Sequence, residues 1–216
     1  MSFLNMGTVY GTLLNFRAEL AAWAPKMNEA PYKAPPKAPV LYIKPSNTWS
    51  MDAAPIVVPA HIDQVEIGAT IAMVMRGPGD IAGYVLMNDF SEPHDSYYRP
   101  PIRQKCLDGF LGVGGQMLES GTGVDPAAFK LEVRVNDELR QTVDFSNLVR
   151  SAPQLLADVS EFMTLGAGDV LMLGCDVLPD GRRPLASRGD KVELRAEGMG
   201  TLTNYLVREV TLKDFQ

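Results

Sequence analysis

The 216-residue sequence has few of the residues that mark several common classes of protein. Its two cysteines, Cys106 and Cys175, form no CxxC pair or closely spaced set, so a disulfide framework is not expected. Its two histidines, His61 and His94, cannot supply an HExxH metalloprotease motif. No GxSxG, GxGxxG or GxxxxGK[ST] pattern occurs. The sequence therefore lacks the usual signatures of a metalloprotease, a serine hydrolase or a nucleotide-binding protein.

Two further absences concern targeting and partners. No stretch approaches the roughly 20 apolar residues that a membrane-spanning helix needs. Residues 1–6 lack the basic region and the following apolar run of a signal peptide, so we expect a cytoplasmic protein. The net charge is −6, from 20 basic and 26 acidic residues, which argues against nucleic acid or a membrane surface as a partner.

The residues that are present indicate a globular chain, with 46% hydrophobic and 21% charged residues. Near the N-terminus we expect a strand over 8–14 and a short helix from Arg17 to Trp23, ended by Pro25. Five prolines between 25 and 39 exclude a helix there. We interpret this segment as an ordered extended loop.

Apolar runs bounded by turn residues predict strands along the rest of the chain. Residues 70–75 and 83–87 flank a turn at 77–80, and 131–135 and 139–143 form a predicted hairpin. Further strands are predicted at 40–43, 170–173, 191–195 and 206–210.

One helix has clear predicted boundaries. Ser151 and Gln154 form a capping box, an apolar stripe runs from Leu155 to Met163 and includes Phe162, and Gly166 ends the helix. Many short strands with one such helix predict a mixed, β-rich fold. We expect a single domain over 1–216, with the strand, short helix and proline-rich loop of 1–39 packed on it.

Candidate site residues concentrate between Asn88 and Asp108. Asn88 and Asp89 end an apolar strand, where a carboxylate can project into a cleft. Tyr98, Arg99, Arg103 and Lys105 follow within a few residues, and guanidinium groups bind carboxylates bidentately. The cluster is either a pocket for carboxylates or a solvated basic loop.

Two other segments are open to two interpretations. Lys44 ends a predicted strand just before Pro45 and Asn47, and is either a second cationic contact or an exposed lysine. The glycine-rich run 112–115 is either a tight turn or an anion-binding loop.

Taken together, these segments resemble the fumarylacetoacetate hydrolase family. The resemblance is carried by Leu14–Arg17, Pro31–Lys37, Ile43–Thr48, Gly68–Thr70, Asn88-Asp89, Tyr98–Pro100, Lys105–Phe110, Leu155–Leu165, Gly168-Asp169 and Ala196–Gly198. Within the family, the chain most resembles the N-terminal half or subunit of the bifunctional isomerase/decarboxylase of 4-hydroxyphenylacetate (homoprotocatechuate) degradation.

The resemblance implies a β-sandwich-like roll with a divalent metal in a central cleft. Asp89 matches a metal-ligating aspartate of the family, whereas Gly68 and Thr70 stand where the family has two glutamates. Glu19 stands in place of a catalytic histidine. Since Mg²⁺ needs several oxygen ligands, we expect Mg²⁺ to be weakly bound or absent.

The resemblance also implies a function, namely decarboxylation of a polyanionic 2-oxo acid such as 5-oxopent-3-ene-1,2,5-tricarboxylate, with isomerisation as the companion activity. The catalytic candidates are Lys105 and Arg103, which would stabilise an enolate, and Tyr98, which would assist proton delivery. The substrate-binding candidates are Lys44, Asn47, Thr70 and Arg99. We expect Lys44, Arg99, Arg103 and Lys105 to converge on one cavity beside Asp89.

A second interpretation stays open. The missing glutamates and histidine also fit a catalytically impaired subunit that completes a metal-bearing companion. The resemblance implies either a homo-oligomer or such a pairing, and it includes no nucleic-acid or membrane partner.

Overall fold

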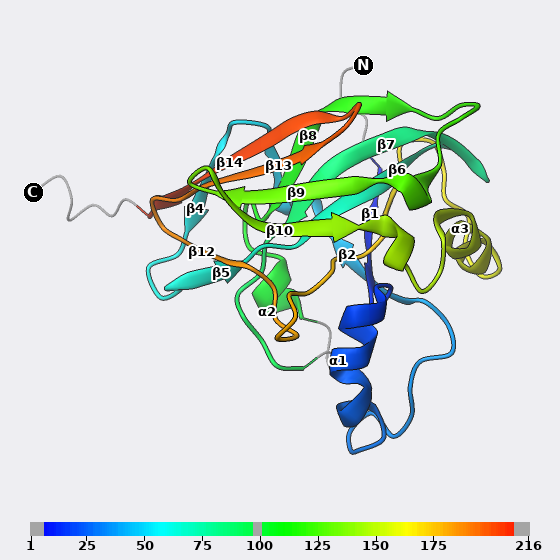
Figure 1. Ribbon diagram of the computed structural model, residues 1–216, viewed down its shortest axis with the longest axis horizontal. Helices are drawn as coiled ribbons and strands as arrows, with labels where there is room; N and C mark the ends of the chain where they lie inside the picture. The colour runs from blue at the N-terminus through cyan, green and yellow to red at the C-terminus, as the bar shows by residue number, and fades with distance from the viewer. Residues whose placement is uncertain (1–6, 97–100, 210–216) are drawn as a thin grey trace, which may run out of the picture.

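The computed structural model describes residues 7–96 and 101–209, so Tyr98 and Arg99 lie outside the described residues. In these ranges the chain forms a seven-stranded sheet, a five-stranded sheet, a two-stranded ribbon and three α-helices (Figure 1). The predicted mixed, β-rich fold is therefore confirmed. No described helix combines the length and the apolar character needed to cross a membrane.

The seven-stranded sheet curls on itself. Its order is β2 (Val40–Lys44), β1 (Val9–Leu13), β11 (Val170–Met172), β6 (Ala69–Gly77), β7 (Asp80–Asp89), β8 (Leu111–Glu119) and β3 (Trp49–Met51). A flat sheet of this size would separate β2 and β3 by about 29 Å. Only residues 45–48 connect these two edge strands, and five residue steps span at most about 18 Å. The sheet must therefore bend until its edges approach each other.

The second sheet covers one face of the first. It contains β10 (Glu138–Asp144), β9 (Lys130–Val135), β13 (Lys191–Ala196), β14 (Gly200–Arg208) and β4 (Pro55–Val58), and the ribbon pairs β5 (Gln64–Glu66) with β12 (Leu185–Ser187). The largest core cluster takes residues from both sheets, including Ile71, Leu86, Val133 and Leu194, all fully buried. Burial of this apolar surface is the main force that holds the two layers together.

A smaller core lies inside the curled sheet. Its buried members all come from that sheet: Val9, Ala72, Val85, Met87, Leu111, Val113, Val170 and Met172. Tyr42 of β2 and Trp49 of β3 pack against them. Because side chains alternate along a strand, Val85, Met87 and Asp89 share one face of β7, and Ala72 and Thr70 share that face of β6. Asp89 and Thr70 therefore lie at the end of this inner core.

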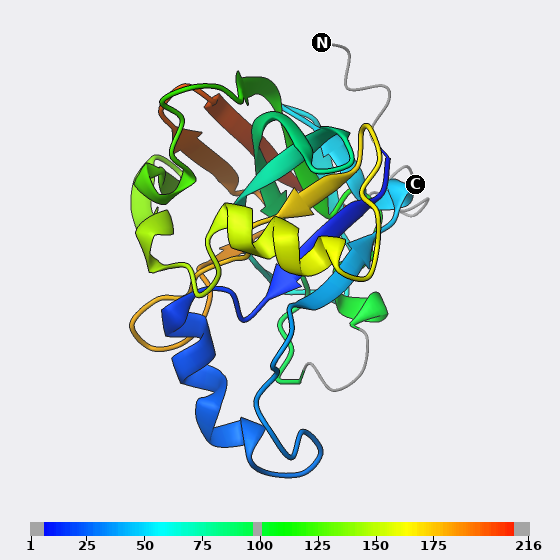
Figure 2. The ribbon, with the colours of Figure 1, turned by 90° about the vertical axis from the view of Figure 1, so that its right-hand side faces the viewer.

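The helices lie outside the sheets. Helix α1 (Arg17–Met27) extends away from them, and residues 28–39 return from it to β2 (Figure 2). The prediction that Pro25 ends this helix is wrong. Pro25 sits in the last turn, and buried Trp23 and Met27 pack with Leu13 and Leu14 on both sides of it. This packing outweighs the one hydrogen bond that the proline cannot donate.

Helix α3 (Ala152–Ser160) begins as predicted, with the Ser151 hydroxyl accepting a hydrogen bond from the Gln154 backbone at 3.4 Å. It ends earlier than predicted, so the predicted stripe through Phe162 is wrong at that residue. Phe162 is 62% exposed. Helix α2 (Ile102–Lys105) is a single turn after β7.

Both predicted hairpins are confirmed. Strands β6 and β7 pair around the turn at 77–80, and β9 and β10 pair around Asn136 and Asp137, whose φ angles of 50° and 69° suit a type I′ turn. Both interpretations of 112–115 are wrong, because these residues lie in β8. Here glycine permits close packing, since a Cβ on Gly112 would come within 2.6 Å of the Asn204 side chain.

Candidate active site

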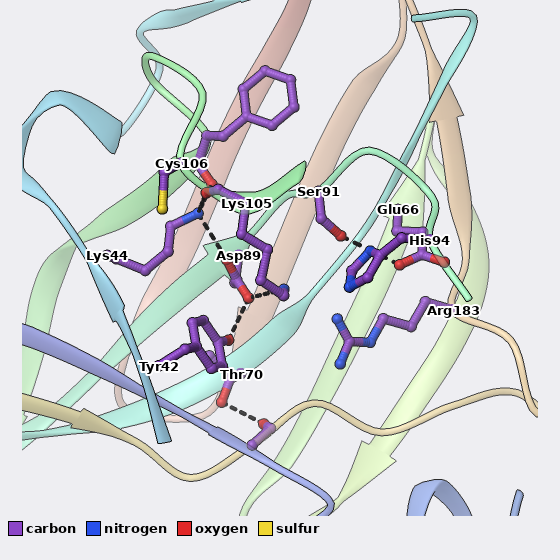
Figure 3. A network of polar contacts seen from close by, with 12 residues as sticks. Tyr42, Lys44, Glu66, Thr70, Asp89, Ser91, His94, Lys105, Cys106 and Arg183 are labelled. Carbon is purple, nitrogen blue, oxygen red and sulfur yellow. Dashed lines mark hydrogen bonds and ion pairs between the residues drawn. The ribbon is translucent and has the colours of Figure 1, made fainter. Parts of the chain in front are cut away.

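The carboxylate of Asp89 is the centre of a buried charge network (Figure 3). Lys44 Nζ lies 2.9 Å from Oδ1, and Lys105 Nζ lies 2.5 Å from Oδ2. The Tyr42 hydroxyl also donates to Oδ2. The three charged side chains are at most 1% exposed. Two ammonium groups thus share one carboxylate, and the centre carries a net positive charge.

Burial and these neighbours set the proton affinities of the centre. Burial by itself would raise the pKa of Asp89, but Lys105 and then Lys44 hold it well below its ordinary value. Burial lowers the pKa of Lys44, although Asp89 opposes this shift. Burial and the Asp89 charge raise the pKa of Tyr42, so its hydroxyl stays protonated and donates to Asp89.

The two lysines differ in how many of their donors are used. An ammonium group has three N–H donors. Lys44 Nζ contacts three acceptors, namely Asp89, the Lys105 carbonyl and the Phe110 carbonyl at 3.0 Å. Among the described residues, Lys105 Nζ donates only to Asp89, and it lies 4.9 Å from the centre of the Tyr42 ring. Lys105 therefore keeps two donors for another partner.

The sheet explains how these groups meet. Lys44 and Tyr42 lie two residues apart on β2, which places both side chains on one face of that strand. Opposite Tyr42 on β1 is Gly11, where a Cβ would come within 2.0 Å of the Tyr42 ring. The missing side chain at Gly11 makes room for the ring beside Asp89.

A second group of polar side chains lies beside Lys105 (Figure 3). Arg183, from the segment before β12, pairs with Glu19 of α1 at 3.0 Å, and both are buried. Glu19 also accepts a hydrogen bond from the Leu14 backbone at 2.6 Å. Burial raises the pKa of Glu19, while Arg183 lowers it. This pair joins α1 to the side of the centre.

His94 faces the same region. Its Nδ1 lies 3.0 Å from the Glu92 carbonyl, which can only accept, so Nδ1 carries the proton. Burial lowers the pKa of His94, and the positive charges of Lys105 and Arg183 act in the same direction. The ring is therefore neutral near pH 7.

The predicted site residues are only partly brought together. Lys44, Lys105 and Asp89 form the centre, and Thr70 lies beside it with its hydroxyl donating to the Gly174 carbonyl at 2.5 Å. Asn47 is exposed and donates to the Cys106 carbonyl at 3.1 Å and to Asp108 at 2.7 Å. Arg103 is exposed on α2. The roles of Arg103 and Asn47 stay predictions, as do those of Tyr98 and Arg99.

Sequence reasoning missed three members of the two groups, Tyr42, Arg183 and His94, and it missed that Glu19 pairs with Arg183. The two-residue spacing of Tyr42 and Lys44 on a predicted strand was a usable signal for Tyr42. Arg183 had no such signal, because it lies in an irregular segment 164 residues from Glu19.

The residues at Asp89 do not fit a divalent metal. Both Asp89 oxygens already contact ammonium groups, and the Thr70 hydroxyl is directed to a carbonyl. A Cβ on Gly68 would lie 2.2 Å from the Asp89 backbone oxygen, so a glutamate there has no room. In residues 7–96 and 101–209, no group of three or more His, Cys, Asp or Glu side chains could hold a metal ion.

The tight fit at Gly68 gives a first prediction. We expect Gly68→Ala to lower the free energy of unfolding by about 1–3 kcal/mol, because the new methyl group overpacks the backbone that carries Asp89. Chemical denaturation measures this effect. Gly77→Ala is the matched control, since a Cβ at Gly77 meets nothing within 4 Å. Equal stability of the two variants would contradict the described packing at Asp89.

Comparison with known proteins places this geometry in a family. Residues 8–207 match the family described as fumarylacetoacetate (FAA) hydrolase C-terminal. The chain is 38% identical over 219 residues to the 4-hydroxyphenylacetate degradation bifunctional isomerase/decarboxylase of Escherichia coli. This match covers 96% of the chain and 49% of that protein. The chain thus spans about half the length of this relative and of two similar curated bifunctional isomerase/decarboxylases.

Solved structures show the same fold. The 2-hydroxyhepta-2,4-diene-1,7-dioate isomerase from Mycobacterium marinum is 25% identical, with a TM-score of 0.73 over 95% of this chain and 76% of that one. A maleylpyruvate hydrolase from Sphingobium sp. SYK-6, solved with manganese(II) and pyruvate, is 21% identical, with a TM-score of 0.72 over 94% and 71%. At that identity the second structure supports the fold alone.

Proposed function

The chain belongs to the fumarylacetoacetate hydrolase family, and from this premise we propose that it is a decarboxylase of a 2-oxo polycarboxylic acid in aromatic catabolism. The observation that carries the proposal is the buried centre in which Lys44 and Lys105 both contact Asp89. An excess of buried positive charge beside two further polar side chains, Arg183 and His94, suits a multiply charged anion (Figure 3). The E. coli relative carries isomerase and decarboxylase in its name.

The proposed reaction needs an acceptor for electrons. As the distal carboxylate leaves as CO₂, the electron pair of the broken C–C bond moves through the conjugated chain to the 2-oxo oxygen. The product is an enolate, which takes up a proton to become 2-hydroxyhepta-2,4-diene-1,7-dioate. In this proposal Lys105 stabilises the negative charge on that oxygen, because its ammonium group has donors that are not used by Asp89.

Other residues have supporting roles in the proposal. Arg103 adds positive charge near Lys105, Tyr98 assists proton delivery, and Arg99, Asn47 and Thr70 position the substrate. The compartment is the cytoplasm, and isomerisation of the product is the companion activity.

A second candidate function has its own observations. By the family resemblance, Gly68 and Thr70 stand in place of two glutamates. Glu19 pairs with Arg183, and the chain spans about half of the E. coli relative. These facts suit a subunit that assembles with a metal-bearing family member, or with further copies of itself, and contributes little chemistry.

Turnover by the purified chain separates the two functions. We expect the chain alone to consume 5-oxopent-3-ene-1,2,5-tricarboxylate, followed by ultraviolet absorbance and CO₂ release. We expect Lys105→Ala to lower kcat by about 10²–10³-fold, the usual effect of removing a donor that stabilises an oxyanion. Lys130→Ala is the control, because the Lys130 side chain is 69% exposed. Activity that appears only after addition of a metal-bearing family member would favour the second function.

A further inference from the structure

We infer that Lys44 and Lys105 together replace the divalent ion at Asp89, with Lys105 as the contact for the 2-oxo acid and Lys44 as a fixed counter-ion. The identity of the ligand class rests on the proposed function. The replacement itself rests on the geometry of the centre, which can be tested without turnover.

The net charge of the centre differs from that of a carboxylate metal site. A divalent ion held by three carboxylates leaves a net charge of −1. Asp89 with Lys44 and Lys105 leaves +1, at ion-pair distances of 2.9 and 2.5 Å. A buried centre with this excess attracts an anionic 2-oxo acid directly, because the low local dielectric strengthens the attraction.

The N–H donors of Lys105, rather than those of Lys44, are available to a ligand. Lys44 is held by its ion pair with Asp89 and by hydrogen bonds to the Lys105 and Phe110 carbonyls, so its position is fixed by three contacts. Lys105 has two donors left among the described residues. A 2-oxo acid offers a carboxylate oxygen and a ketone oxygen on neighbouring carbons, so one ammonium group can bind both.

His94 and Arg183 lie beside the Lys105 ammonium group. In Figure 3 the Lys105 ammonium group lies on the side of Asp89 that faces His94 and Arg183. Both Lys105 and Arg183 lower the pKa of His94, although less than burial does, so the three groups lie close enough to interact. An acid bound at Lys105 would therefore lie on the side of Asp89 that carries the Arg183 guanidinium group.

Close packing at Gly68 excludes a metal-ligating side chain from that position. Gly68 touches the Asp89 backbone, so the ligand that would complete a carboxylate site cannot be accommodated there. A metal ion would also have to displace both ammonium groups from Asp89. The two ammonium groups already offset the charge of Asp89 without a metal ion.

The test uses oxalate, a planar mimic of the enolate of a 2-oxo acid, and the full chain treated with EDTA. Isothermal titration calorimetry should show oxalate binding without added metal. Lys105→Met should weaken this binding by about 10- to 100-fold, because a charge-assisted pair of hydrogen bonds is lost. Lys130→Met should bind oxalate as the unmodified chain does. Lys44→Met should lower the melting temperature yet still bind oxalate more tightly than Lys105→Met.

Manganese supplies a second arm that needs no variant. Electron paramagnetic resonance of Mn²⁺ titrated into the unmodified chain should show no stoichiometric binding, and Mn²⁺ should not tighten oxalate. Binding of one Mn²⁺ per chain that Asp89→Asn abolishes would overturn the inference. So would a failure of the unmodified chain to bind oxalate without metal, or undiminished binding by a folded Lys105→Met variant.

The inference and the proposed function can fail separately. Metal-free oxalate binding without turnover of the tricarboxylate would support the inference and contradict the proposed decarboxylase activity. Turnover that depends on stoichiometric Mn²⁺ would keep the decarboxylase and sink the inference.

Discussion

Asp89→Asn is expected to lower the free energy of unfolding by about 3–5 kcal/mol, a large fraction of the stability of an ordinary domain. The variant keeps the shape of the side chain but leaves the Lys44 and Lys105 ammonium groups buried and without their counter-ion. Two like charges held close together in a buried site repel each other, and neither can return to water without opening the inner core. Urea denaturation at neutral pH measures the loss.

Acid provides an internal check on that result. Because the pKa of Asp89 is lower in the folded chain than its ordinary value of 3.8, its carboxylate stabilises the fold at any pH above that value. This contribution is lost as the pH falls below 3.8 towards the folded pKa. The stability difference between the unmodified chain and Asp89→Asn should therefore shrink below that pH. A difference that stays constant as the pH falls would show that the charge of Asp89 is not its source.

Asp80→Asn serves as the matched control for the aspartate. Asp80 lies at the other end of β7, where it pairs with Arg76 at 3.0 Å with both side chains more than half exposed. An exposed pair of this kind contributes little, at most about 1 kcal/mol. A loss at Asp89 no larger than that at Asp80 would contradict the buried network.

Glu19→Gln is expected to cost about 3–5 kcal/mol as well, through a different partner. A guanidinium group stays charged, so the variant removes a carboxylate that pairs with Arg183 in a buried site. The glutamine oxygen can still accept the hydrogen bond from the Leu14 backbone, so the helix start is not otherwise disturbed. Thermal and chemical denaturation should both report the loss.

A double variant makes the assignment specific. Glu19→Gln combined with Arg183→Met removes the guanidinium charge as well, and we expect it to recover most of the stability lost by Glu19→Gln alone. Additive losses in the double variant would show that the two side chains act independently. Glu29→Gln, at an exposed position just after α1, should be close to neutral.

Much of the fold was predictable because local signals agreed with tertiary packing. The hairpins at 77–80 and 136–137, the start of α3 and the strand that ends at Asp89 all follow from spacing and turn residues. The family resemblance, confirmed by the match over 8–207, added the mixed roll. The errors arose where packing overrode a local preference. Residues 112–115 continue a strand, and a Cβ on Gly112 or Gly114 would come within 2.6 or 3.1 Å of atoms on neighbouring strands.

The site was predictable in its charges and not in its connections. Asp89 and Lys44 could be selected because each ends a predicted strand, and Lys105 because it lies in a cationic cluster; all three match the family pattern. That Lys44 would spend its donors on two backbone carbonyls depends on the path of 105–110, which no local pattern encodes. The Glu19–Arg183 contact depends on the same kind of long-range closure.

The short link between β2 and β3 has a consequence for the order in which the molecule acquires its parts. Residues 45–48 hold the two sheet edges close together. On either side of Pro45, Lys44 and Asn47 donate hydrogen bonds to the Lys105 and Cys106 carbonyls. These contacts join residues about 60 positions apart, so they form only after a large loop has closed. The buried Lys44–Asp89–Lys105 centre, and with it the proposed anion site, therefore forms late in folding, and a chain that has collapsed without closing its sheet lacks it. An anion that binds there recognises only the finished molecule, and by mass action it should protect the whole fold against unfolding.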